Sequence, residues 1–167
     1  SLINDVLDLS ALESGDLPAQ RQPVPIASLV QQSLPLLQPQ ADAAGVRLCQ
    51  GELEGTAIAD PVALRQALLN LLSNAIKYNR RGGEVRVEAA PRDGRLCLAV
   101  SDSGRGMSAH QLAHLFEPFN RLGREREGIE GTGIGLAIVK ASIQRMGGSV
   151  TVCSREGEGS RFELELP

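Results

Sequence analysis

The sequence lacks an excess of positive charge, any long apolar run and a secretion signal. Its 17 Lys and Arg stand against 20 Asp and Glu, which leaves a net charge of −3, and the basic residues are spread along the chain. A nucleic-acid partner or contact with an anionic membrane would call for a concentrated basic patch. No apolar run approaches the roughly 20 residues of a membrane-spanning helix. We therefore expect no nucleic-acid partner and no membrane contact from this stretch of chain.

Cysteine is also scarce. Cys49, Cys97 and Cys153 lie far apart in apolar, alternating segments, and an odd, scattered set suits neither a disulfide framework nor a zinc site. A reducing, cytoplasmic environment is the simplest interpretation. The 167 residues match one compact domain with a short appendage, large enough for a hydrophobic core without disulfides or metals.

The N-terminal stretch has helical periodicity from its first residues. Apolar residues from Leu2 to Leu12 recur at helical spacing, and the pattern stops at Ser14-Gly15, a sequence suited to a helix end. The chain begins directly inside this amphipathic pattern, which we interpret as a piece of a longer protein. The proline-containing stretch that follows predicts an extended connector up to Pro25.

The remaining chain alternates between helix and strand signals. Helices are predicted at Ile26 to Ala44, kinked or broken by Pro35 and Pro39, at Asp60-Pro61 to about Tyr78, and from about Thr132 to Gly147. Strands are predicted at 46–50, 56–59, 84–90, 96–100, 149–154 and 161–166. The long segment from Ser108 to Gly131 is rich in glycine and charge, and only 109–116 has a helical pattern, which is typical of a functional lid or a disordered loop.

One face of the helix after Asp60 is polar. Asn70, Asn74 and Lys77 share it, opposite the leucines. A solvated face is the ordinary explanation, but Asn is a poor helix former, so a pair at i and i+4 indicates a specific task. A carboxamide oxygen is a suitable ligand for Mg²⁺ when phosphates supply the remaining ligands.

Two glycine-rich segments could border a ligand. Asp102 to Gly106 directly follows a strand, and a carboxylate there can accept a hydrogen bond from an amine such as adenine N6, although an ordinary turn could look the same. Gly131 to Leu136 opens a helix, where backbone N–H groups form a natural anion site. It lacks the Lys of a Walker loop and the early βαβ position of a dinucleotide fold.

In this order, the segments resemble the ATP-binding domain of sensor histidine kinases, within the superfamily of gyrase, heat-shock chaperone and mismatch-repair ATPases. Residues 70–78 resemble the family's N box and 102–106 its first glycine box. Residues 116–119, Phe-Glu-Pro-Phe, resemble the F box, and 131–136 the second glycine box. The resemblance implies a two-layer α/β sandwich of the Bergerat type, with a mixed, largely antiparallel sheet covered by three helices. It also implies three parts: residues 1–17 as the end of a dimerisation and phosphoacceptor helix, 18–25 as a linker, and 26–167 as the catalytic domain, with an ATP lid at about 107–131.

The resemblance also implies the roles of individual residues. Asn74 would ligate Mg²⁺, and Asn70, Lys77 and Arg121 would contact phosphate. Asp102 would read adenine, helped through water by Ser160, while Tyr78, Gly104, Gly106 and Met107 would lie beside the nucleotide. Phe116 and Phe119 would anchor the lid through apolar contacts. The lid's hinge over the triphosphate would consist of Gly131, Thr132, Gly133, Ile134, Gly135 and Leu136.

Asn70 separates two classes of this superfamily. Its ATP hydrolases carry a glutamate there as general base, and an amide cannot accept a proton. We therefore expect Asn70, Asn74 and Lys77 to serve phosphoryl transfer from Mg-ATP to a histidine. The phosphoacceptor histidine is absent, so this chain alone should not phosphorylate itself. His110 and His114 are better explained as solvated lid residues than as phosphoacceptors or a metal pair.

The implied partners are the phosphoacceptor domain of the same protein and the receiver domain of a response regulator, in a full-length homodimer that could be anchored to a membrane. Two alternatives stay open. One is a degenerate domain that binds nucleotide as a scaffold, and the other is a hydrolytic ATPase of the same superfamily.

Overall fold

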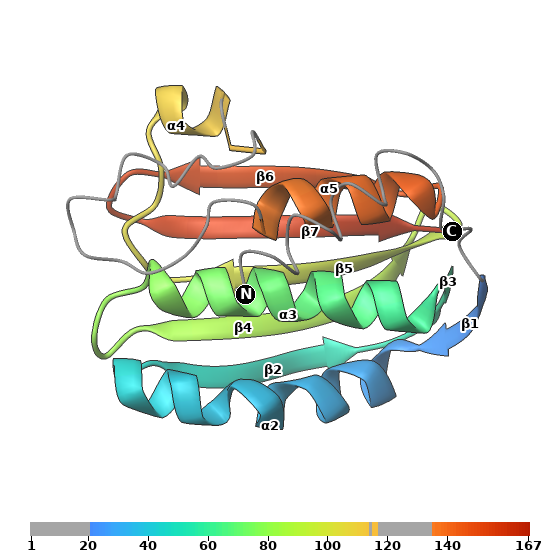
Figure 1. Cartoon of the computed structure of the whole chain (residues 1–167), viewed down its shortest axis with the longest axis horizontal. Coiled ribbons are helices and arrows are strands. Elements are labelled where there is room, and N and C mark those ends of the chain that lie inside the picture. Colours follow the sequence, from blue (N-terminus) through green and yellow to red (C-terminus); the bar gives the residue numbers. More distant parts are fainter. Residues whose placement is uncertain (1–20, 114, 117–134) are drawn as a thin grey trace.

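A five-stranded mixed sheet forms the framework of the chain in the computed structural model (Figure 1). The structure describes residues 21–113, 115–116 and 135–167. The sheet has the strand order β2-β4-β5-β7-β6, and a second, two-stranded sheet pairs β1 with β3. The strands are β1 (Gln22–Pro25), β2 (Arg47–Leu53), β3 (Thr56–Ala59), β4 (Glu84–Arg92), β5 (Arg95–Asp102), β6 (Ser149–Arg155) and β7 (Gly159–Leu166).

Among the described strands of the main sheet, only one pair is parallel. β2 runs parallel to β4, whereas the β4–β5, β5–β7 and β6–β7 pairs are antiparallel. β4 and β5 form the hairpin predicted from Asp93-Gly94, both of which have positive φ. β5 then pairs with β7 from the far end of the sequence, so Asp102 lies opposite Ser160. This non-local pairing brings the predicted first glycine box next to the C-terminal strand.

The helices are α2 (Ile26–Ala44), α3 (Pro61–Lys77), α4 (Ala109–Ala113) and α5 (Gly135–Arg145). α3 begins as predicted, because the Asp60 carboxylate accepts hydrogen bonds from the backbone N–H groups of Val62 at 3.0 Å and Ala63 at 3.2 Å. α4 is shorter than the predicted 109–116. For the last helix, the predicted start at Thr132 lies outside the described residues.

The first helix was predicted to be kinked or broken, and the prediction of a break is wrong. α2 continues through Pro35 and Pro39 without interruption. Both prolines are exposed and lie one turn apart on the same face, where water can satisfy the carbonyl groups that lose a backbone partner. Gln22–Pro25, expected as part of an extended connector, pairs with β3 as strand β1.

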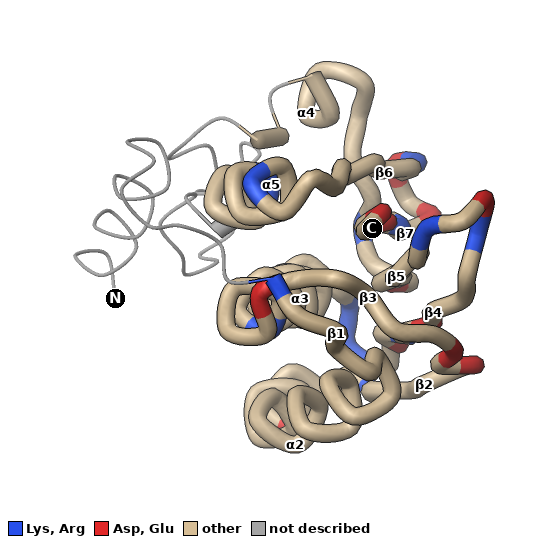
Figure 2. The backbone as a smooth tube through the Cα atoms, turned by 90° about the vertical axis from the view of Figure 1, so that its right-hand side faces the viewer, with Lys and Arg blue, Asp and Glu red and all other residues tan. Residues whose placement is uncertain are grey.

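α2, α3 and α5 cover one face of the main sheet (Figures 1 and 2). Alternate residues of the sheet point into this layer and are buried, among them Val85 and Val87 of β4 and Leu98 of β5. The leucine face of α3 packs against them, with Leu64, Leu68 and Leu72 fully buried. The predicted α/β sandwich, with a mixed, largely antiparallel sheet under three helices, is therefore confirmed.

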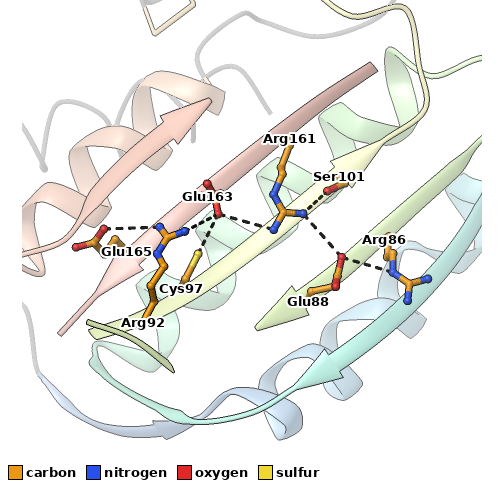
Figure 3. A network of polar contacts seen from close by, with 8 residues as sticks. All are labelled: Arg86, Glu88, Arg92, Cys97, Ser101, Arg161, Glu163 and Glu165. Carbon is orange, nitrogen blue, oxygen red and sulfur yellow. Dashed lines mark hydrogen bonds and ion pairs between the residues drawn. The ribbon is translucent and has the colours of Figure 1, made fainter. Parts of the chain in front are cut away.

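The opposite face of the sheet carries charged side chains (Figure 3). Glu163 lies at the centre of a row of ion pairs, 3.2 Å from Arg92 and 3.7 Å from Arg161, and the Cys97 thiol donates a hydrogen bond to it at 3.2 Å. That hydrogen bond, together with the two arginines, lowers the pKa of Glu163, while burial raises the pKa of Cys97. This polar face explains why the described helices cover the sheet on one side only.

Among the described residues, no helix has both the length and the apolar character needed to cross a bilayer.

Candidate functional site

A small pocket opens where the C-terminal part of α3 meets the ends of β5 and β7. It is lined by Asn74, Tyr78, Asp102, Gly106, Met107, Ser160 and Phe162. Its volume of about 30 Å³ is enough for an ordered water molecule. Six of these seven residues were predicted as site residues from the sequence, and they come from segments up to 86 positions apart, between Asn74 and Ser160. The seventh residue, Phe162, was expected to pack in the core. Its side chain belongs to the core and also lines the pocket.

Asp102 is held at the pocket by its own loop. It is the last residue of β5, and its Oδ1 accepts a hydrogen bond from the backbone N–H of Gly104 at 2.8 Å. Gly159 of β7 comes so close that a Cβ there would lie 2.1 Å from the carbonyl oxygen of Asp102. The carboxylate is thus positioned by a tight turn on one side and by a neighbouring strand on the other.

The two glycines of this loop are required by space. A Cβ at Gly104 would lie 2.6 Å from the carbonyl oxygen of Tyr78, and a Cβ at Gly106 would lie 1.8 Å from that of Arg155. Gly106 also has φ of +66°, a backbone angle that residues other than glycine rarely adopt. The loop therefore runs closely between the end of α3 and the turn that joins β6 to β7.

Arg80, which the sequence analysis did not single out, bridges these segments. Its Nη2 donates hydrogen bonds to the carbonyl oxygens of Gly104 at 2.9 Å and Gly157 at 3.0 Å. The backbone adds a second link, from Gly157 N–H to the carbonyl of Arg105 at 2.6 Å. Three segments around the pocket are therefore fastened to one another.

Ser154 of β6 supports the pocket from another side. Its Oγ accepts a hydrogen bond from the backbone N–H of Met107 at 2.8 Å and lies 2.8 Å from the Oγ of Ser160. A serine in an alternating strand carries no sequence signal that would have marked this role. Met107 and Ser160, both predicted as site residues, are thus connected through Ser154.

Of the three residues predicted on the polar face of α3, only Asn74 lines the pocket. Asn70 lies one turn earlier, and the Nε2 atom of Gln66 is 3.5 Å from its Oδ1. Lys77 is the last residue of the helix. Asn70 and Lys77 are both half-buried. Neither belongs to the lining residues. The three side chains therefore lie along one polar line of the helix, with Asn74 at the pocket between the other two.

The described N-terminal part of the predicted lid and the start of α5 contact the helical layer and the core. Leu115 is buried, and Phe116 packs against the core with the Lys140 ammonium 5.3 Å from its ring centroid. Gly135 begins α5, and Leu136 is buried in the core. The predicted residues Phe119, Arg121, Gly131, Thr132, Gly133 and Ile134 lie outside the described residues, as does His114.

The described residues contain no group of three or more His, Cys, Asp or Glu side chains that could hold a metal ion. A divalent ion coordinated entirely by these protein side chains is therefore not supported, whereas an ion shared with a phosphate ligand needs only one or two protein oxygens. The Asn74 carboxamide can supply such an oxygen.

The chain falls into a known class of proteins. The family model described as "Histidine kinase-, DNA gyrase B-, and HSP90-like ATPase" matches residues 59–167, which include the whole region from α3 to β7. The chain belongs to this family.

Within the family, the chain is similar to several histidine kinases. The chain is 42% identical over 170 residues to "Histidine protein kinase DivJ" of Caulobacter vibrioides, a match that covers 99% of this chain and 28% of that protein. It is 36% identical over 171 residues to "Circadian input-output histidine kinase CikA" of Synechococcus elongatus, covering 99% of this chain and 23% of the relative. The chain thus spans only about a quarter of the length of these relatives.

Solved structures agree with this placement. The fold superimposes with a TM-score of 0.87 on full-length ShkA in complex with AMPPNP, at 34% identity, covering 99% of this chain and 35% of that one. The mycobacterial sensor histidine kinase MprB matches with a TM-score of 0.77 at 27% identity, covering 89% of this chain and 97% of that one. The resemblance to the catalytic ATP-binding domain of histidine kinases is therefore confirmed.

Proposed function

We propose that this chain binds Mg-ATP and transfers its γ-phosphate to a histidine on the phosphoacceptor domain of a two-component sensor kinase. The observation that carries the proposal is the convergence of Asn74 and Asp102 on one pocket at the junction of α3, β5 and β7. A relative whose name is "Histidine protein kinase" and a similar structure that holds an ATP analogue support this activity.

The base of the nucleotide would occupy the pocket around Asp102. Its carboxylate would accept a hydrogen bond from adenine N6, with a water held near Ser160, because the pocket has room for one water molecule between these groups. The pocket of about 30 Å³ is smaller than a purine, so the base would also occupy space beyond it. Tyr78, Gly104, Gly106 and Met107 would then border the ring.

The phosphates would extend along the polar line on α3. Asn74 would supply an amide oxygen to Mg²⁺, and Asn70 and Lys77 would contact phosphate together with Arg121. The backbone of residues 131–136 would cover the triphosphate ahead of α5. When bound, Mg²⁺ neutralises developing charge on the phosphates. The protein's own contribution would be to orient the γ-phosphate and to exclude water.

Asn70 favours phosphotransfer over hydrolysis. A hydrolytic ATPase needs a general base to activate water, and a carboxamide cannot accept that proton. Transfer to histidine needs no such base on the kinase, since a neutral imidazole is already a nucleophile. A hydrolytic ATPase is therefore the weaker alternative, and a nucleotide-binding scaffold differs from the proposal only in lacking transfer.

The proposed partners follow from this chemistry. They are the phosphoacceptor domain of the same protein, which residues 1–17 would join, and a response regulator receiver domain that takes the phosphate onward. We place the domain in the cytoplasm and the full-length protein in a homodimer.

A transfer experiment tests the proposal. The chain should label a separately purified phosphoacceptor domain with phosphate from γ-labelled ATP and Mg²⁺, in acid-labile form, while remaining unlabelled when incubated alone. Asn74→Ala should abolish the labelling. Binding of ATP without any transfer would favour the scaffold, and steady release of phosphate by the chain alone would favour the hydrolase.

A further inference from the structure

Arg80 lies just beyond α3, outside every segment to which the proposed function assigns a role. Its guanidinium forms what we call the Arg80 clamp: one nitrogen, Nη2, donates to the carbonyls of Gly104 and Gly157 at 2.9 and 3.0 Å. The residue is exposed, so apolar packing does not explain the position of its side chain. Its visible role is to fasten two loops that border the pocket.

The clamp acts on the residue that holds the Asp102 carboxylate. Gly104 is tied at both ends, since its N–H donates to Asp102 Oδ1 at 2.8 Å and its carbonyl accepts from Arg80. Without a side chain, glycine has wide backbone freedom, and these two bonds restrict it. The bond from the guanidinium is charge-assisted and so stronger than a neutral one.

We propose that Arg80 is a positioning residue that sets the orientation of the Asp102 carboxylate, and thereby the preference of the site for a 6-amino purine. This inference rests on the proposed function, in which Asp102 reads adenine. Arg80 itself does not line the pocket. Its influence would pass through the peptide groups around Gly104.

The inference predicts a change in selectivity rather than a uniform loss of binding. ATP presents a 6-amino donor to a carboxylate, whereas ITP presents a 6-oxo acceptor in the same place. Arg80→Met keeps the length of the aliphatic stem but removes the donors. It should weaken ATP binding about tenfold, the loss expected when a hydrogen bond to a charged group is misaligned. ITP binding should change by less than about twofold, because ITP does not use that bond.

The experiment is calorimetric titration of the full chain with Mg-ATP and Mg-ITP, for the wild type, Arg80→Met and Arg80→Lys. Lys restores a cationic donor and should recover most of the ATP preference. Arg65→Met is the matched control, because Arg65 is an exposed arginine at the other end of α3, beside β1 and α2. If the Met variant does not fold, Arg80→Gln, which is shorter and neutral, serves in its place.

The outcomes separate the two proposals. A fall in the ATP-to-ITP affinity ratio for Arg80→Met, with recovery in Arg80→Lys and none of the effect in Arg65→Met, supports the clamp. An unchanged ratio in a folded variant, or an equal loss for both nucleotides, overturns it while leaving the proposed function in place. A wild-type chain that does not prefer ATP to ITP would instead refute the assignment of Asp102.

Discussion

Replacement of Gly106 by alanine should destabilise the pocket loop far more than its backbone angle alone explains. The residue has φ of +66°, for which any L-residue costs about 1–2 kcal/mol. In addition, the new Cβ would lie 1.8 Å from the carbonyl oxygen of Arg155 and 2.6 Å from its carbon, so backbone must move. Overpacking of this kind costs about 1–3 kcal/mol more. The total expected loss is therefore about 2–5 kcal/mol.

A matched control isolates the steric part. Gly94, in the β4–β5 turn, has φ of +77°, and a Cβ there would meet no atom within 4 Å. Gly94→Ala should therefore lose only the backbone term of about 1–2 kcal/mol. Urea unfolding of the two variants, compared through their midpoints at equal slope, measures the difference. Equal losses for Gly106→Ala and Gly94→Ala would refute the close approach of the loop to the β6–β7 turn.

Two further changes test the structure away from the pocket. Asp60→Ala should cost about 1 kcal/mol by removing the cap of α3, measured by thermal or urea unfolding, and a value near zero would contradict the capping contacts. Glu163→Gln tests a pH-dependent part of the stability. The pKa of Glu163 is lowered from 4.5 in the folded chain. The stabilisation from its ionised form is therefore present above about pH 4.5 and is lost as the pH falls through the lowered value. The stability difference between wild type and Glu163→Gln should therefore shrink on acidification, and a difference that stays constant from pH 7 to pH 3 would contradict the ion network.

The predictions that succeeded rest on local signals. Asp60-Pro61 marked the start of α3, and Asp93-Gly94 marked the β4–β5 turn, because a cap and a tight turn depend on residues a few positions apart. β1 was not predicted as a strand, since four residues that include two prolines gain strand geometry only by pairing with β3, more than 30 positions away.

Other features of the site depend on contacts that no sequence period reveals. Arg80 and Ser154 act on backbone groups of distant loops, so neither belongs to an amphipathic pattern. The parallel pairing of β2 with β4 likewise joins segments that are far apart in the sequence, such as those of Arg47 and Glu84. The resemblance supplied the set of residues around the pocket, and the fold explains why residues as distant as Asn74 and Ser160 lie together.

The central claim is that Asn74 and Asp102 hold opposite ends of one nucleotide. Calorimetric titration of ATP with and without Mg²⁺, for the wild type, Asn74→Ala and Asp102→Asn, tests it most directly. Asn74→Ala should remove the Mg²⁺-dependent part of the affinity, whereas Asp102→Asn should weaken binding by about tenfold or more whether or not Mg²⁺ is present. Unchanged affinity in both variants, or the same Mg²⁺ dependence in all three proteins, would contradict the account.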